Sequence, residues 1–304
     1  MHKYTYPFIA FCTSLFLFAS CAKDDTPPGT VPTESGKLSK IEIEQDQYPW
    51  VQQPPQLTVD TFTYIGNRIN SIERIARVPF SPSQSYLWVY RYEPGRILAS
   101  VSSGPTRRII TIDPSNGYLL TDSTDPKIAT SFFDTTVYFL NKCTYESNGF
   151  IKTNLLSYKR IQSFFSDRLI TTFDQLTTYT NDGANITTKV ETVTQRDSTF
   201  SYANGSLLNV KLSVIRIRKV VTYGNEEVKS PPLVSPLVFG KANKKLPVRE
   251  DATYEVSNDG GVTFSPISRV EKLEYRYEFK GERLVRVIEK LSEFPEKRTT
   301  FFYL

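Results

Sequence analysis

Histidine and cysteine are scarce in this sequence, which has one of the former and three of the latter. His2 and Cys12 lie in the first 20 residues, which read as a removable segment. Once that segment is lost, no imidazole remains for acid–base catalysis or zinc binding. Ser-His-Asp and Cys-His catalysis are then excluded. No GxGxxG motif and no Walker-type lysine is present either. We therefore predict a protein that is not an enzyme, with no cofactor and no catalytic or metal-binding residue.

A long hydrophobic run is also missing. The apolar stretch from Phe8 to Phe18 follows a basic start at Lys3 and is shorter than the roughly 20 residues that span a bilayer. It ends in Ala19-Ser20-Cys21, a small-residue cleavage site directly before a cysteine. This pattern resembles the bacterial lipoprotein signal, except that Phe18 stands where Leu is usual. The resemblance implies that residues 1–20 are removed and that Cys21 is lipidated.

The residues after Cys21 carry a second resemblance. Lys23, Asp24 and Asp25 resemble the lysine-plus-acids export signal of surface lipoproteins in Bacteroidota. One acyl chain anchors a protein marginally, whereas two or more hold it firmly. A lipoprotein of this kind would carry two or three chains of the palmitate type. The expected location is the outer membrane, lipid-anchored and facing the cell exterior, with its periplasmic face as the alternative.

The mature chain is expected to lack both an intramolecular disulfide and a concentrated basic patch. Cys143 is the cysteine left after processing, so an intramolecular disulfide is impossible, and its strand-like surroundings predict a buried thiol. The net charge of +5 is spread along the chain. The cluster at residues 216–219 alternates with apolar residues, and the one at 241–245 lies in a polar stretch, so we expect no nucleic-acid partner.

Three segments make up the expected organisation. Residues 1–20 form the signal peptide, residues 21–37 form the lipidated cysteine and a flexible Pro-, Thr- and Gly-containing tether, and residues 38–304 form a single β domain. The first strand is expected from Leu38 to Glu44, where apolar and polar residues alternate. A proline-rich loop near residues 231–243 offers a possible division, but the same sequence pattern continues on both sides of it.

A loose repeat dominates the domain. An alternating strand rich in Tyr, Phe and Thr leads into a turn, and a second strand follows. Asn-Gly and Asp-Gly steps accept the positive φ that tight hairpins require. A lone hairpin is marginal, so stacked neighbours are expected. The turns are expected at residues 66–67, 94–95, 114–117, 146–149, 181–183, 204–205, 258–261 and 280–281. The pattern predicts an all-β fold, an antiparallel meander of hairpins in a curved sheet or open barrel-like array.

One stretch, residues 161–176, is ambiguous. The apolar residues of this stretch could form one face of a helix; they are Ile161, Phe164, Phe165, Leu169, Ile170 and Phe173. The neighbouring Thr-rich, strand-like sequence favours a strand instead. We expect at most one short helix in the domain, and it would lie in this stretch.

Two copies of the repeat carry a family resemblance. Residues 90–97 (Tyr-Arg-Tyr-Glu-Pro-Gly-Arg-Ile) and 275–284 resemble the tyrosine-aspartate (YD, Rhs-type) repeat of uncharacterised Bacteroidota lipoproteins. Arg91 and Arg276 stand where that repeat has aspartate. The resemblance implies an antiparallel β-array and carries over no functional site.

Aromatic residues supply the candidate binding face. Tyr86, Trp88, Tyr90 and Tyr92 fall on one side of a strand by its period of two. Exposed tyrosine and tryptophan rings stack on sugars or grip protein partners, and the alternative is that these rings pack in the core. Trp50 lies in a proline-flanked loop and is a further candidate.

Carboxylates supply the alternative functions. Paired acids can hydrolyse glycosides, and Glu42 with Glu44 or Glu271 with Glu274 are candidate pairs, although solvated strand edges are the favoured explanation. Oxygen-rich turns at Asp113–Asn116 and Asn181–Asp182 could hold calcium or be plain turns. The leading hypothesis is a lipid-anchored binding or structural module with a glycan or protein ligand. A carboxylate-based hydrolase, such as a glycosidase, and a carrier of lipid or envelope components with an apolar cavity are the alternatives.

Overall fold

The structure is a computed structural model that describes residues 37–46, 54–77, 79, 82–101, 107–124, 137–163, 167–201, 203–227, 240–292 and 294–304. Those residues form strands and connections without any helix, and hence nothing helical that could cross a membrane. The strands are β1 (Leu38–Gln45), β2 (Gln56–Ile65), β3 (Arg68–Arg77), β4 (Gln84–Glu93), β5 (Arg96–Val101), β6 (Arg107–Ile112), β7 (Leu119–Thr124), β8 (Val137–Tyr145), β9 (Ile151–Ser163), β10 (Asp167–Asn181), β11 (Ile186–Ser201), β12 (Leu207–Glu227), β13 (Lys245–Ser257), β14 (Ser265–Lys280), β15 (Arg283–Leu291) and β16 (Lys297–Tyr303).

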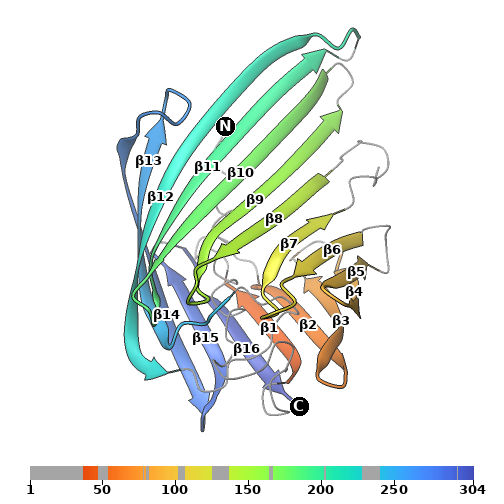
Figure 1. Cartoon of the computed structure of the whole chain (residues 1–304), viewed down its shortest axis with the longest axis vertical. Helices are drawn as coiled ribbons and strands as arrows, with labels where there is room; N and C mark the ends of the chain where they lie inside the picture. Colours follow the sequence, from red (N-terminus) through yellow and green to blue (C-terminus); the bar gives the residue numbers. More distant parts are fainter. Residues whose placement is uncertain are drawn as a thin grey trace.

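These 16 strands form one closed antiparallel barrel (Figure 1). Each strand pairs with its neighbours in the sequence, and β1 closes the ring by pairing with both β2 and β16. The predicted all-β meander of hairpins is confirmed, and the array is closed. The helical alternative for residues 161–176 is wrong, because the described part of that stretch lies in β9 and β10. The Thr-rich strand sequence outweighs the apolar spacing there.

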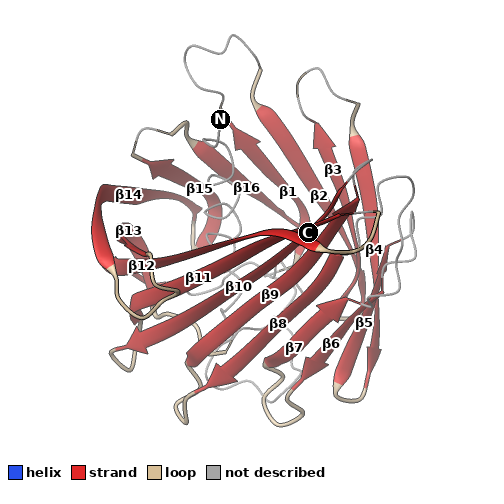
Figure 2. Ribbon diagram, turned by 90° about the horizontal axis from the view of Figure 1, so that it is seen from above, coloured by secondary structure: helices blue, strands red, loops and turns tan. Residues whose placement is uncertain are grey.

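The predicted turns lie between consecutive strands. Their glycines take positive φ, for example 58° at Gly66 and 62° at Gly281, a conformation that glycine adopts at little cost. The turns at Gly66, Gly95, Gly117, Gly149, Gly183 and Gly281 join strands at the same end of the barrel, which we call the turn end. Both termini of the barrel lie there too, since the Leu304 amide donates to the Lys37 carbonyl at 3.1 Å. The opposite end is the loop end (Figure 2).

Strand alternation divides the barrel wall into an inner and an outer face. Directly opposed residues in antiparallel strands share a face, so the registers can be followed around the ring. Most buried residues fall on the inner face, where side chains from non-adjacent strands meet; Val214 and Ser257, next to the β13–β14 turn, are buried on the outer face.

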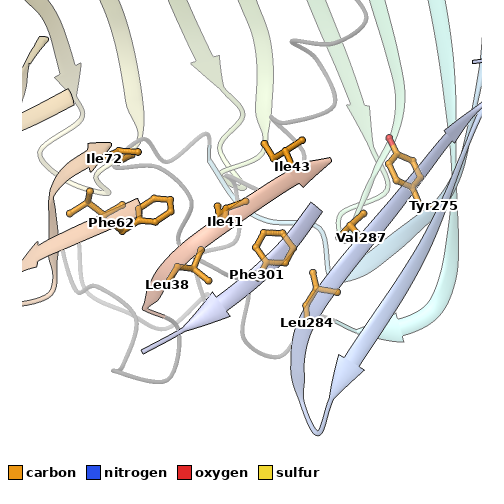
Figure 3. Close-up of a cluster of buried hydrophobic side chains, with 10 residues drawn as sticks. Leu38, Ile41, Ile43, Phe62, Ile72, Tyr275, Leu284, Val287 and Phe301 are labelled. Carbon is orange, nitrogen blue, oxygen red and sulfur yellow. The ribbon is translucent and has the colours of Figure 1, made fainter. Parts of the chain in front are cut away.

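Two buried apolar clusters fill the inner face near the turn end. Figure 3 shows one of them, in which side chains of β1, β2, β3, β14, β15 and β16 converge. The other joins strands from β5 to β9 with the start of β11. The first contains Leu38, Ile41, Ile43, Phe62, Ile69, Ile72, Tyr275, Leu284, Val287 and Phe301, and the second contains Ile97, Ala99, Ile110, Leu119, Cys143, Phe150, Ile151 and Ile186.

Candidate functional site on the inner wall of the barrel

The predicted aromatic ladder lies on the inner face of β4. Trp88 and Tyr90 are half-buried and pack against both apolar clusters, which they connect. Tyr92 packs at the turn end. Tyr86, nearest the loop end, is 40% exposed, and its hydroxyl donates to Gln84 Oε1 at 2.9 Å. The ladder thus runs from the core to an accessible residue, and Tyr86 is the member that a ligand could reach without unpacking the barrel.

Six tyrosines line the inner wall at the turn end, and we call them the tyrosine floor. Each of its members, on an even-numbered strand, bonds through its hydroxyl to the backbone of the preceding strand near that strand's start. The donors and acceptors are Tyr92 to Ile69 O, Tyr145 to Leu119 O, Tyr223 to Ile186 O, Tyr277 to Pro247 O and Tyr303 to Leu284 O, at 2.5–2.8 Å, and the Tyr64 hydroxyl accepts from the Leu38 amide at 3.0 Å.

The tyrosine floor explains the repeat seen in the sequence. Tyr64, Tyr92, Tyr145 and Tyr277 each precede a turn glycine by two to four residues. At that position the ring points inward, and its hydroxyl reaches a carbonyl or amide near the start of the preceding strand. The sequence predicted tyrosine-rich strands that lead into turns but not this bond.

Burial governs the ionisation of these inner tyrosines. Desolvation raises the pKa of Tyr90 to about 12 and that of Tyr303 to about 12. The pKa of Tyr92 and of Tyr145 is raised further, again chiefly by burial. The neutral phenol is thereby stabilised in the folded state. These groups act as hydrogen-bond donors and apolar surface, and not as bases, at neutral pH.

Five ion pairs lie on the inner face, and every pair except Glu191–Lys219 contains a residue two or three positions farther from the turns than a member of the apolar clusters. We call them the ion-pair belt. Their charged atoms are within hydrogen-bond distance in every pair. The pairs are Asp60–Arg74 (2.7 Å), Asp122–Arg108, Lys189–Glu250 (2.9 Å), Glu191–Lys219 (2.6 Å) and Glu289–Lys297 (2.9 Å).

Glu250 has the most connected carboxylate of the belt. It accepts from Lys189 Nζ at 2.9 Å and from the Tyr275 hydroxyl at 3.0 Å. Desolvation acts to raise the pKa of Glu250, but the charges of Lys189 and Lys219 outweigh it, and the net pKa is lowered. Glu250 is therefore held as an anion, which is the opposite of what a general acid requires.

The predicted acid pairs are not assembled for catalysis. Glu42 and Glu44 lie on the outer face of β1, and Glu42 pairs with Lys40 at 2.8 Å. Glu271 is on the inner face of β14, bound to Arg269 and to the Tyr254 hydroxyl, whereas Glu274 is on the outer face. The two members of the second pair therefore point to opposite sides of the wall.

The predicted calcium loops use their carboxylates within their own turns. Asp113 accepts from the amide and hydroxyl of Ser115, and Asp182 accepts from the amides of Ala184 and Asn185. Within the part of the chain that the structure describes, no group of three or more His, Cys, Asp or Glu side chains could hold a metal. Both loops have the geometry of side-chain-capped turns.

Cys143 lies in the second apolar cluster and is 3% exposed, as expected of a buried thiol. Asn154 Nδ2 approaches its Sγ at 3.4 Å. Burial raises the pKa of the thiol to about 12, so the reactive thiolate is suppressed at neutral pH.

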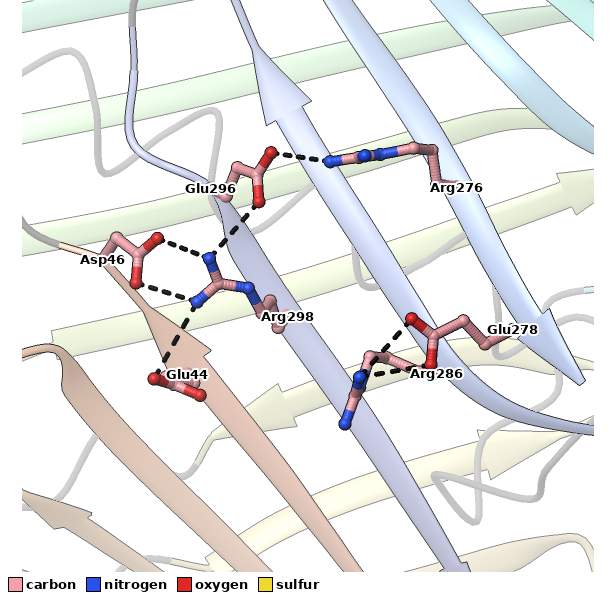
Figure 4. Close-up of polar contacts among 7 residues, drawn as sticks. All are labelled: Glu44, Asp46, Arg276, Glu278, Arg286, Glu296 and Arg298. Atoms are coloured by element: carbon pink, nitrogen blue, oxygen red, sulfur yellow. Dashed lines mark hydrogen bonds and ion pairs between the residues drawn. The ribbon is translucent and has the colours of Figure 1, made fainter.

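The outer face of β14, β15, β16 and β1 is densely charged, and we call it the charged arc. Figure 4 shows its ion pairs, in which Arg298 contacts Asp46 at 2.7 Å and Glu296 at 3.3 Å. Arg276 also binds Glu296, at 2.7 Å. The outward-facing charged residues of the four strands are Lys40, Glu42, Glu44, Lys272, Glu274, Arg276, Glu278, Lys280, Arg286, Lys290 and Arg298.

Four predicted site residues and one loop aromatic fall outside the described residues. They are the lipidation site Cys21, the export-signal residues Lys23, Asp24 and Asp25, and Trp50. Their predicted roles stay predictions.

Comparisons with solved structures find distant likenesses. A porin-like protein from Bacteroides vulgatus is 11% identical, with a TM-score of 0.46 over 88% of this chain and 99% of that one. A porin-like protein from Bacteroides uniformis is 13% identical, with a TM-score of 0.43 over the same shares. No family model and no curated protein matches the sequence.

Proposed function

We propose that this chain is a lipid-anchored protein of the outer membrane, held through Cys21 and facing the cell exterior. Its barrel stands in water beside the membrane and serves as a binding or structural module for a glycan or protein. The lysine and aspartates after Cys21 support the export step, and the Tyr-to-Gly spacing supports kinship with YD-type repeat lipoproteins. The observation that carries the proposal is the charged arc.

The charged arc is unfavourable in contact with lipid. An arginine or lysine on the lipid face of a barrel costs about 2–4 kcal/mol at the bilayer midplane. The outer face of β14 alone presents Lys272, Arg276 and Lys280, with Glu274 and Glu278 between them. The Arg276 side chain is 65% exposed. This surface is more stable in water than in lipid. The lipid on Cys21, and not a membrane-spanning barrel, therefore holds the protein at the membrane.

The inner wall supports a module rather than a pore. Barrels that conduct ions have a polar, water-filled interior. Here two apolar clusters and the tyrosine floor fill the inner face near the turn end. The same packing gives no support to a carrier with a large apolar cavity there. The pairing of the interior acids likewise gives no support to a carboxylate-based hydrolase.

Ligand contact is proposed at the loop-end part of the ladder. Tyr86 offers an accessible ring, and Trp88 lies next along the same inner face. Rigid aromatic area with a polar edge suits sugar rings and protein side chains alike. A glycan array with the wild type and Tyr86→Ala tests this. Tyr86→Ala is expected to weaken binding without changing stability, whereas unchanged binding would remove Tyr86 from the site.

The anchoring proposal is tested by fractionating cells that express the wild type or Cys21→Ser. The wild type is expected to incorporate radiolabelled palmitate, to sediment with membranes and to be digested by protease added to intact cells. Cys21→Ser is expected to lose the label and to appear folded in the soluble fraction. Cys143→Ala, which removes a buried thiol, is the matched control and should stay membrane-bound. A Cys21→Ser protein that still requires detergent for release would contradict the proposal.

A further inference from the structure

The loop end of β12 carries a strand edge without a partner among the described strands. β12 pairs with β11 from Leu207 onward, but its pairing with β13 begins at Val214, opposite Ser257. Residues 207–213 are therefore hydrogen-bonded on one side only, and we call them the projecting edge. Figure 1 shows β11 and β12 rising past the end of β13.

The projecting edge is apolar and exposed. Val210 and Leu212 lie on the outer face and are 45% and 44% exposed, and Leu208, at the register shift beside Asn209, is 55% exposed. Leu207 is also 55% exposed. Exposed, flat, hydrophobic edges offer unpaired N–H and C=O groups and template strand addition. This stretch thus combines unpaired backbone N–H and C=O groups with an apolar face.

A second strand edge lies at the same end of the barrel, on β14, and its sequence differs from that of the projecting edge. β14 lacks a partner on its β15 side until Leu273, so residues 265–271 also form an edge. That edge contains Pro266, and its Arg269 binds Glu271. A bulge between Thr253 and Tyr254 distorts the pairing with β13. Proline and charge are devices that block strand addition. The projecting edge has no proline and one charged residue, Lys211, and its single register irregularity lies at its far end, between Leu207 and Asn209.

We propose that the projecting edge pairs with the same edge of a second copy of this chain. The pairing is antiparallel about a two-fold axis through Val210. It sets Val210 opposite Val210 of the other copy and Leu208 opposite its Leu212. An isologous interface of this kind requires a self-complementary surface.

The sequence of the edge meets that requirement. On the outer face the pairing joins apolar residues from each copy into one patch. On the inner face it places Lys211 opposite Asn209, so that no like charges are directly opposed, which would destabilise the pair. Because the strands run antiparallel, the turn ends of the two barrels point away from each other.

The test is crosslinking of the full-length lipoprotein in intact cells with a short, membrane-permeant bismaleimide. Directly opposed Cβ atoms in antiparallel strands are about 5 Å apart, so Val210→Cys is expected to give a band of twice the monomer mass. Val220→Cys is the matched control, because it lies on the same strand at 44% exposure but pairs with both β11 and β13. Val220→Cys should give no crosslinked band, and neither should the wild type, whose Cys143 is buried.

A second variant tests the same pairing without a reagent. Val210→Lys puts two positive charges opposite each other on the proposed axis and is expected to convert the detergent-extracted protein from dimer to monomer in sedimentation velocity. Its far-UV circular dichroism should match the wild type. The proposal is overturned if Val210→Cys gives no dimer, gives a crosslink to a different protein, or crosslinks no better than Val220→Cys. A monomeric wild type, or a Val210→Lys protein that stays dimeric, would overturn it as well.

Discussion

The hydroxyl of Tyr92 donates a hydrogen bond of 2.8 Å to the carbonyl oxygen of Ile69, which ties the end of β4 to the start of β3. The same relationship recurs around the turn end in the tyrosine floor. It links a sequence pattern, tyrosine shortly before a turn glycine, to a physical role in tying neighbouring strands together at the turn end.

Tyr92→Phe removes this hydrogen bond while keeping the ring. It is expected to lower the free energy of unfolding by about 1 kcal/mol, the usual net value of one hydrogen bond, because the Ile69 carbonyl loses its partner. Urea denaturation measures the change. Tyr86→Phe is the control, since its hydroxyl meets the exposed Gln84 side chain. Equal effects of the two variants would argue against a special role for the floor.

Glu250→Gln tests the ion-pair belt. The substitution leaves Lys189 buried without its counter-charge, and breaking such a pair typically costs about 3–5 kcal/mol. Glu255→Gln is the comparison, because Glu255 pairs with Arg216 at 3.4 Å in a half-exposed position, where a pair is worth at most about 1 kcal/mol. Chemical denaturation of both variants should separate them clearly. Similar small losses of unfolding free energy in both variants would show that the buried pair adds no more stability than the half-exposed one.

Alkaline titration tests the buried tyrosines. Folding raises the pKa of Tyr90 and of Tyr303 to about 12, whereas an unfolded chain releases the same protons near pH 10. The stability that they contribute is present below about pH 10 and is lost as the pH rises towards 12. Absorbance of phenolate at 295 nm should show a late, cooperative ionisation that coincides with loss of β-sheet signal. Full ionisation near pH 10 with the fold intact would contradict the burial.

Cys143 should be inert in the native protein. Its thiol is buried, and its pKa is raised to about 12, so a maleimide at pH 7.5 should label it only after unfolding in urea. Because folding favours the protonated thiol, its contribution to stability is present below the ordinary thiol pKa near 8.5 and declines above it. Rapid labelling without denaturant would show that the cluster around Cys143 opens readily.

The hairpin pattern could be predicted from the sequence because its signals are local. Turn glycines such as Gly66 and Gly281 and the alternation beside them specify each hairpin without reference to the rest of the chain. Closure could not be predicted, because it depends on β1 meeting β16 across more than 250 residues. The Thr-rich stretch around Phe173 was ambiguous because its apolar spacing suits either period.

The candidate site was predictable in part. The common face of Tyr86, Trp88, Tyr90 and Tyr92 follows from strand periodicity. Whether that face points inward or outward depends on closure, and so does the split of Glu271 and Glu274 between two faces. The ion-pair belt joins residues far apart in sequence, such as Lys189 and Glu250, and no local signal marks it.

We propose that the outer wall of the barrel faces water, and the accessibility of introduced cysteines measures this. Two cysteine variants are made in the full-length lipoprotein, whose own Cys143 is buried. Arg276→Cys lies on the charged arc. Leu176→Cys faces outward on β10, where Leu176 is 43% exposed. Isolated membranes are treated with a water-soluble, bilayer-impermeant maleimide. The account predicts rapid labelling at both positions before any detergent is added. Protection of Leu176→Cys until the membrane is dissolved would show that lipid surrounds the wall and would contradict it.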